Sequence, residues 1–321
     1  MSASDQLLRA EAEDDAAASA RAAELTIAEL STMPEMRRAS ALMDRVWRPG
    51  NGAAMMPEAL LKVLSSTGGY VAGGFRGGRM VGVCVGLLSQ WGLHSHIAAV
   101  EDPLRGAGLG RAIKLDQRAW ALRRGIGTVT WTYDPLISRN AYFNLAKLGA
   151  VAAEYHADYY GTMNDEVNAG SPTDRVLVRW ELASRRVRRV LHEGATAAAH
   201  DGAATHDGVV IALAVGRDGS PVLGLGSRDA RRLLVGIPKD AEALRVSDPD
   251  LAARWRPALR DVLGGLMAAG GHVTGFTRDG QYVVERAVER PDATASADPA
   301  PDPASDPAPD PAPDPARKDR A

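Results

Sequence analysis

Hydrophobic and polar positions between residues 24 and 183 follow helical and strand periodicities in turn. From Met33 to Trp47 apolar residues recur near helical spacing, which predicts an amphipathic helix. The segment Thr128–Tyr133 is rich in β-branched and aromatic residues and predicts a strand that stops at Asp134. The full set of predicted elements is strand 26–30, helices 33–47 and 57–64, strands 70–75, 80–87 and 94–100, helix 109–124, strand 128–133, helix 138–148, and strands 150–160 and 176–182. This order predicts an α/β (α+β) fold, in which helices cover both faces of a mixed sheet.

The segments outside this region have other patterns. Residues 1–23 are rich in Ala, Glu and Asp without a large apolar stripe, which predicts a mobile or weakly helical extension. Residues 184–290 predict a smaller α+β appendage with strands 209–215 and 233–238, a helix from the N-cap Asp248 to Ala268, and a closing hairpin of 272–277 with 281–286. The Asp-Pro-Ala repeats of 291–321 cannot bury a core and predict a disordered tail.

Charge and cysteine content limit the classes of function. The chain has 321 residues and a formal net charge of -2, so nothing in its charge favours nucleic acid or an anionic membrane. The basic run Arg185–Arg189 predicts a solvated helix face. Cys84 is the only cysteine, which excludes an internal disulfide and a cysteine-based zinc cluster. No apolar stretch has the length of a membrane span and the N-terminus has no secretory pattern, so we expect a cytoplasmic protein.

A glycine-rich stretch joins the predicted strand 94–100 to the helix that follows it. Arg105-Gly106-Ala107-Gly108-Leu109-Gly110-Arg111 places three glycines two residues apart, directly before a helical pattern. A strand, a glycine turn and a helix N-terminus together form a site for an anion, most often phosphate. The spacing does not match the P-loop or the dinucleotide fingerprint. A tight turn without a ligand is the alternative.

Arg105-x-x-Gly108-x-Gly110 resembles the Arg/Gln-x-x-Gly-x-Gly/Ala loop of the GNAT acetyltransferases. The order of elements over residues 24–183 is similar to the GNAT fold, whose mixed sheet is mostly antiparallel. Further segments resemble a branch of predicted acetyltransferases associated with N-acylamino acid metabolism: 131–136, 140–150, 159–161, Asp165, Asn168 and 173–175. The appendage is similar to the C-terminal portion of the same branch.

This resemblance implies an acyl-CoA co-substrate, acetyl-CoA or another acyl-CoA, and no metal. It implies that Val100 offers backbone groups to the pantetheine arm. It also implies that the loop cradles the pyrophosphate, through Arg105, Gly106, Gly108, Leu109, Gly110 and Arg111. Many relatives carry a tyrosine as the catalytic acid where this chain has Leu145, and an asparagine where it has Ser138. The identity of the acid is therefore open, with nearby tyrosines or water as alternatives.

The general base has two candidates. Strict side-chain alternation places His94 and His96 on the face of Ala98 and Val100, with His96 about 13 Å from Val100 at ~3.3 Å per residue. An imidazole suits proton removal near neutral pH. Glu101, at the end of the strand, is the alternative base. A hydrogen-bonded histidine without a catalytic role and an exposed turn carboxylate are the corresponding structural interpretations.

Polar residues in the branch-like segments are candidates for acceptor recognition, namely Asn140, Asn144, Asp174 and Arg175. An arginine could pair with a substrate carboxylate through two hydrogen bonds. Asp174 and Arg175 could equally form a structural pair.

The leading hypothesis is an N-acyltransferase that moves an acetyl or succinyl group to the amino group of a small molecule, in particular an amino acid. The alternative is a catalytically degenerate GNAT domain that binds acyl-CoA as a sensor or scaffold. The sequence leaves open whether the protein dimerises and whether the appendage covers the acceptor site.

Overall fold

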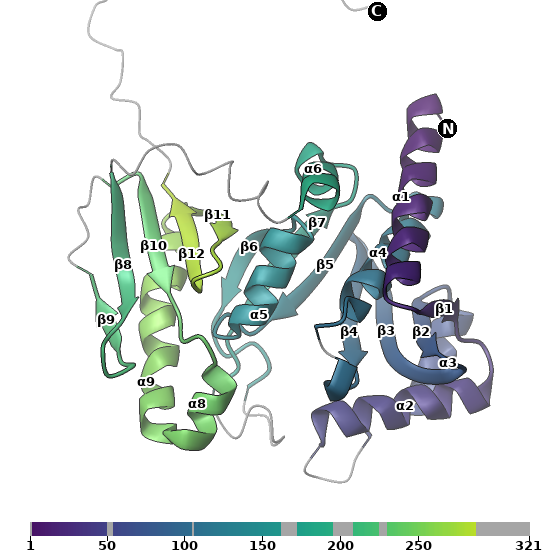
Figure 1. Ribbon diagram of the computed structural model, residues 1–321, viewed down its shortest axis with the longest axis horizontal. Helices are drawn as coiled ribbons and strands as arrows, with labels where there is room; N and C mark the ends of the chain where they lie inside the picture. The colour runs from purple at the N-terminus through teal and green to yellow at the C-terminus, as the bar shows by residue number, and fades with distance from the viewer. Residues whose placement is uncertain are drawn as a thin grey trace, which may run out of the picture. The chain divides into compact units, whose positions relative to one another are not determined.

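Seven strands form the first sheet, in the order β1-β2-β3-β4-β5-β7-β6 (Figure 1). The computed structural model describes residues 2–49, 54–104, 106–161, 172–194, 208–224 and 230–286. The strands are β1 Thr26–Glu29, β2 Tyr70–Arg76, β3 Arg79–Ser89, β4 Gly92–Val100, β5 Thr128–Tyr133, β6 Val151–His156 and β7 Arg175–Glu181. Neighbouring strands are antiparallel except β4 and β5, which are parallel. This confirms the prediction of a mixed, mostly antiparallel sheet.

Helices cover both faces of this sheet, as the hydrophobic pattern predicts. The helices α2 (Met33–Trp47) and α3 (Glu58–Ser66) pack on one face, where Met36 and Leu42 meet Val83 and Val85. On the other face lies α4 (Leu109–Arg123), which ends at Gly125. The helix that follows β5 starts as α5 (Ser138–Ala141) and continues as a π-helix, η2 (Tyr142–Lys147).

Residues 3–22, for which the sequence predicts a mobile or weakly helical extension, form the helix α1 (Ala3–Ala22). This helix packs against α4 through Ala12, Ala16 and Ser19, so its buried face consists of small residues. Alanine permits close approach of two helices but leaves no large apolar stripe in the sequence. Ion pairs add to the contact: the buried guanidinium of Arg118 on α4 lies 3.0 Å from a carboxylate oxygen of Asp15.

A second sheet of five strands, in the order β11-β12-β10-β8-β9, forms the appendage. Its elements are β8 Val209–Val215, β9 Pro221–Leu223, β10 Arg232–Gly236, β11 His272–Phe276, β12 Gln281–Glu285, and the helices α8 Ala241–Ser247, α9 Pro249–Leu259, η3 Arg260–Gly264 and α10 Gly265–Ala268. The predicted strands, long helix and closing hairpin are therefore present. The described residues up to Arg286 form one compact unit. The tail 291–321, Asp165 and Asn168 lie outside the described residues.

The helix α6 (Arg185–Glu193) carries the basic run, and part of that run is not solvated. Arg186 donates hydrogen bonds to the backbone oxygens of Gly149, Leu145 and Thr274. It therefore satisfies carbonyl groups at the end of η2, which a helix C-terminus leaves without partners.

None of the described helices combines the length and the apolar character that crossing a bilayer requires.

Candidate functional site

The two parallel strands at the centre of the first sheet separate after a short contact. β4 and β5 pair only at Leu93 with Val129 and at His94 with Thr130. Beyond these positions no described strand pairs with the β5-facing edge of β4, from Ser95 to Val100. Backbone amide and carbonyl groups need hydrogen-bond partners. This edge therefore offers a row of polar backbone groups to a ligand.

A β-bulge at His96 lies where the two strands separate. Val85 pairs with Ile97 and Gly86 with Ser95, so His96 has no partner on β3. The bulge breaks the alternation of side chains. Ser95 faces α4, because it accepts a hydrogen bond from Lys114, whereas Ile97 packs in the cluster with α2.

The predicted common face of the two histidines with Ala98 and Val100 is therefore wrong. Ala98 lies opposite Cys84, and Cys84 accepts a hydrogen bond from Gln117 on α4, so Ala98 faces α4. His94 lies on the opposite face, next to Ser95 and bonded to Thr130 at 3.2 Å. The ring of His96 lies 6.3 Å from that of His94. A ligand on the α4 side of the strand would meet Ala98 and Val100 first.

Ala98 is exposed although its side chain points toward the helix-covered face. The residues beside it on β4, Ile97 and Ala99, are buried under α2. The helix α4 therefore leaves part of its own face of β4 open, directly beside the unpaired edge of that strand. A ligand that lies along β4 requires both features, an open part of the strand face and an edge without a paired strand.

The glycine loop leads into α4 as the sequence predicts. Gly106 and Gly108 have φ values of 87° and 85°, in the left-handed region that favours glycine, and Gly108 is the N-cap of α4. The amides of Leu109, Gly110 and Arg111 have no intrahelical acceptor and lie at the positive end of the helix dipole. Arg105 lies outside the described residues.

Gly110 has no structural need to be glycine. It lies in the first turn of α4, and an added Cβ would meet only the ring of Phe143, at 3.9 Å. Glycine costs about 0.5–1 kcal/mol relative to alanine within a helix. A ligand that approaches the backbone closely would explain this choice of residue.

Two predicted site residues beside the glycine loop, Arg111 and Glu101, form polar contacts with other residues of the chain. Arg111 donates to Ser19 Oγ at 3.5 Å and to the backbone oxygen of Leu191 at 3.2 Å. The carboxylate of Glu101 forms ion pairs with Arg45 at 3.1 Å and Arg79 at 2.6 Å. Arg111 therefore connects α4 to α1 and α6, and the carboxylate of Glu101 is engaged with two arginines.

His96 remains accessible to solvent. The desolvation that it does experience lowers the pKa of His96 below the ordinary value, which favours the neutral ring at pH 7. Burial, His96 and Lys114 lower the pKa of His94 in the same direction. A neutral, accessible imidazole can accept a proton.

A buried polar cluster lies next to the point where β4 and β5 separate, and the sequence pattern did not predict it. Its centre is Lys114, whose Nζ donates to Ser95 Oγ at 3.0 Å and to Gln117 Oε1 at 2.7 Å. The ammonium lies 3.8 Å from the centre of the Trp131 ring on β5. The only feature of the sequence that could have indicated this cluster is Lys114 itself, a lysine among the buried positions of α4.

The polar residues of η2 and α5 differ in accessibility. Asn144 is buried and accepts a hydrogen bond from Trp131 Nε1 at 3.2 Å, so its side chain supports β5 from within the core. Leu145 is also buried. Asn140 is half-buried in α5. The proposed recognition role of Asn144 is therefore not supported by its placement.

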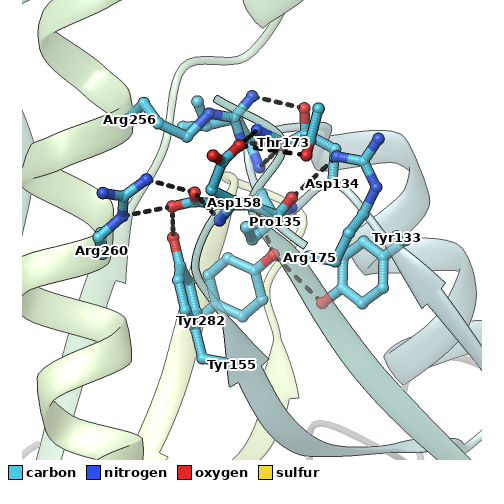
Figure 2. A network of polar contacts seen from close by, with 12 residues as sticks. Tyr133, Asp134, Pro135, Tyr155, Asp158, Thr173, Arg175, Arg256, Arg260 and Tyr282 are labelled. Atoms are coloured by element: carbon cyan, nitrogen blue, oxygen red, sulfur yellow. Dashed lines mark hydrogen bonds and ion pairs between the residues drawn. The ribbon is translucent and has the colours of Figure 1, made fainter. Parts of the chain in front are cut away.

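Asp174 belongs to a polar network that joins β7 to the appendage (Figure 2). Its fully buried carboxylate accepts from Arg260 Nε at 3.0 Å, from Arg260 NH2 at 2.5 Å and from Tyr155 Oη at 2.7 Å. A second ion pair also connects the first sheet with the appendage: Arg256 of α9 donates to both oxygens of Asp134, which follows β5, at 2.6 and 2.7 Å. The carboxylate of Asp174 is thus engaged in hydrogen bonds within the fold.

Arg175 lies beside this network but does not pair with the Asp174 side chain. It donates to the backbone oxygen of Asp174 at 2.9 Å, and its guanidinium lies 5.3 Å from the ring of Tyr160. The structural pair of Asp174 is Arg260, which follows 86 residues later. Burial opposes ionisation of Asp134 and Asp174, but the bonds from Arg256 and Arg260 outweigh it and lower the pKa of both carboxyls.

Several solved acetyltransferase structures are similar to part of this chain. The ribosomal-protein-S18-alanine N-acetyltransferase from Escherichia coli is 15% identical, with a TM-score of 0.40 over 50% of this chain and 95% of that chain. An acetyltransferase of the GNAT family from Streptococcus pneumoniae is 14% identical, with a TM-score of 0.40 over 49% and 98%. The PaiA N-acetyltransferase from Thermoplasma acidophilum, solved in complex with coenzyme A, is 11% identical, with a TM-score of 0.36 over 49% and 98%. No protein-family model and no curated protein matches the sequence.

Proposed function

We propose that the protein is an acyl-CoA-dependent N-acyltransferase. One observation carries the proposal: the parallel strands β4 and β5 separate after two paired positions, and the glycine-led N-terminus of α4 follows the open strand. The separation supplies unpaired backbone groups for an extended arm, and the helix N-terminus supplies amide donors for a phosphate. CoA has both parts, a polar pantetheine arm and a pyrophosphate.

The dimensions of β4 suit such a ligand. With the pyrophosphate at Gly108–Arg111, the pantetheine arm would follow the strand from Val100 toward the bulge. Four residues of strand from Val100 to His96 span about 13 Å at ~3.3 Å per residue. The thioester would then lie near the bulge, where the backbone of His96 has no partner on β3.

The chemistry proposed is direct attack of an amine on the thioester carbonyl carbon. The C–N bond forms as the C–S bond breaks, and the amine loses a proton. His96 is the proposed acceptor of that proton, and its accessible ring and lowered pKa support this role. Most of the rate enhancement would come from holding the two reactants in contact.

The proposed acceptor is a small primary amine, in particular an amino acid, and the proposed acyl group is acetyl or succinyl. Support comes from the resemblance of segments 131–136 and 140–150 to the branch associated with N-acylamino acid metabolism. Of the residues first considered for recognition, Asn140 and Arg175 remain candidates, because Asn144 and Asp174 are buried.

The test is thiol release from acetyl-CoA and from succinyl-CoA with a panel of D- and L-amino acids and simple amines. We expect release that depends on an amino acid, with a preference for one of the two thioesters. Absence of release across the panel, together with absence of CoA binding by calorimetry, would contradict the proposal.

A second candidate function is acyl-CoA sensing without turnover. The observation in its favour is Leu145, a buried side chain without a proton to donate at the position of the usual catalytic tyrosine. The same assay separates the two functions, because a sensor binds CoA but releases no thiol with any amine.

A further inference from the structure

Lys114 is a buried cation at the point where the two strands separate. Ser95 and Trp131 each follow the last paired residue of their strand, His94 on β4 and Thr130 on β5. The ammonium contacts both, through the bond to Ser95 Oγ at 3.0 Å and over the Trp131 ring at 3.8 Å. The side chain of Lys114 therefore closes the vertex of the space between β4 and β5.

Among the residues that the structure describes, no acid pairs with this ammonium. The titratable and polar groups that face it within the described residues come from β3, β4, α4, β5 and β7, namely Cys84, His94, Ser95, Gln117, Trp131 and Trp180. Asp116, on the same helix, is instead bound to Tyr70 Oη at 2.6 Å. Burial of a cation without a carboxylate is costly. It lowers the pKa of Lys114 to about 8.

The α4 side of β4 is open at Ala98, three residues from Ser95, which contacts Lys114. Ala98 faces α4 and is exposed, and Ser95 faces the same helix on the other side of the bulge. An acyl-CoA that follows β4 from the glycine loop would therefore bring its sulfur toward Lys114. A thiolate is an anion, which an unpaired ammonium stabilises and can protonate.

Two positions considered for the acid, Leu145 and Tyr155, do not offer a free proton. Leu145 has no proton to give. The hydroxyl of Tyr155 donates to Asp174 at 2.7 Å, and this bond with burial raises the pKa of Tyr155. The hydroxyl of Tyr142 accepts from Arg278 Nε at 3.3 Å and keeps its own proton, so Tyr142 stays the alternative donor.

We propose that Lys114 is the general acid of the acyl transfer and protonates the departing thiolate of CoA. This inference rests on the proposed function. As the amine nitrogen bonds to the carbonyl carbon, the electron pair of the breaking C–S bond goes to sulfur, which takes a proton from Nζ. The proton lost by the amine passes to His96 or water, and Lys114 regains a proton from water after CoA leaves.

The first experiment measures the thiol of bound CoA, without any acceptor. The full chain and the Lys114→Met and Lys114→Arg variants are each saturated with CoA, and thiolate absorbance is followed against pH, with CoA alone as reference. We expect the thiol pKa to fall by about one unit or more on binding to the wild type. We expect a similar fall in Lys114→Arg and no fall in Lys114→Met.

Each outcome separates the two proposals. Equal thiol titration in all three proteins, with CoA bound, would overturn the role of Lys114 and leave the proposed function standing. No binding of CoA to the wild type would overturn both. Should Lys114→Met not fold, Lys114→Gln takes its place, because it keeps a hydrogen-bonding group for Ser95 without the charge.

The second experiment uses turnover. Loss of a general acid lowers rates by about 10²–10⁴-fold, so kcat of Lys114→Met should fall in this range while KM for acyl-CoA stays within about threefold. Wild-type kcat should decline above a pH of about 8, as Lys114 loses its proton, and this decline should move to higher pH in Lys114→Arg. A decline at the same pH in both proteins would contradict the assignment.

Discussion

Arg260 binds both oxygens of the buried carboxylate of Asp174, through Nε at 3.0 Å and NH2 at 2.5 Å. The two residues are 86 positions apart and connect η3 of the appendage with the start of β7 (Figure 2). Together with Arg256 and Asp134 this pair ties the second sheet region to the first. Loss of Arg260 would leave the buried carboxylate of Asp174 without its cation.

Asp174→Asn should therefore lower the free energy of unfolding by about 3 kcal/mol, because Arg260 and Tyr155 lose a charged acceptor. Chemical denaturation followed by fluorescence measures this difference. Asp14→Asn on the exposed side of α1 is the matched control and should change stability by less than about 0.5 kcal/mol. Equal stability of the two variants would show that the network contributes little.

The same carboxyls predict a pH dependence of stability. The pKa of Asp134 and of Asp174 is lower in the folded protein than the ordinary value of about 3.9. Their contribution is therefore complete above a pH of about 4 and is lost as the pH falls through the folded pKa values. Thermal unfolding between pH 7 and pH 3 should show wild-type stability falling more than that of Asp134→Asn. Parallel curves for the two proteins would contradict the prediction.

The helix α1 predicts a steric effect on stability. Ala12 is fully buried against α4, so Ala12→Leu should overpack the contact and destabilise the protein by about 1–3 kcal/mol. Ala17→Leu makes the same change on the exposed face and should be nearly neutral. Thermal unfolding compares the two variants. A neutral Ala12→Leu would mean that α1 does not pack on α4 in solution.

Gly110 offers a test in which stability and binding change in opposite directions. Gly110→Ala should stabilise the fold by about 0.5 kcal/mol, because an added Cβ meets only Phe143 at 3.9 Å. If CoA contacts the backbone there, the same change should weaken CoA binding several-fold in calorimetry. Gly265→Ala in α10, where an added Cβ would meet nothing within 4 Å, should leave CoA binding unchanged.

Local patterns in the sequence were sufficient for most elements of the fold. The helix 33–47 and the strands 128–133 and 209–215 appear with the predicted bounds, because periodicity and turn residues act over a few positions. The packing of the helix α1 on the fold escaped prediction because its buried face consists of small residues, mainly alanine. Its ion pairs reach Arg118, which lies more than a hundred residues further along the chain.

The candidate site was predictable only in part, because some of its features depend on contacts between segments that are distant in the sequence. The glycine loop is a local pattern, and its turn and helix appear as expected. The bulge at His96 depends on pairing with β3, and it changes which side chains of β4 share a face. The burial of Lys114 and the partner of Asp174 depend on contacts between distant segments. Sequence pattern alone does not encode such contacts.

The most direct test of the central claim is calorimetric titration of the full chain with CoA, in the wild type and two variants. Ala98→Phe fills the exposed position beside the unpaired edge of β4, and Ala18→Phe makes the same change on the exposed face of α1. We predict that wild type and Ala18→Phe bind CoA with the same affinity, and that Ala98→Phe binds at least about tenfold more weakly, a loss of about 1.4 kcal/mol. Equal binding by all three proteins, or no binding by the wild type, would contradict a CoA site between β4 and β5.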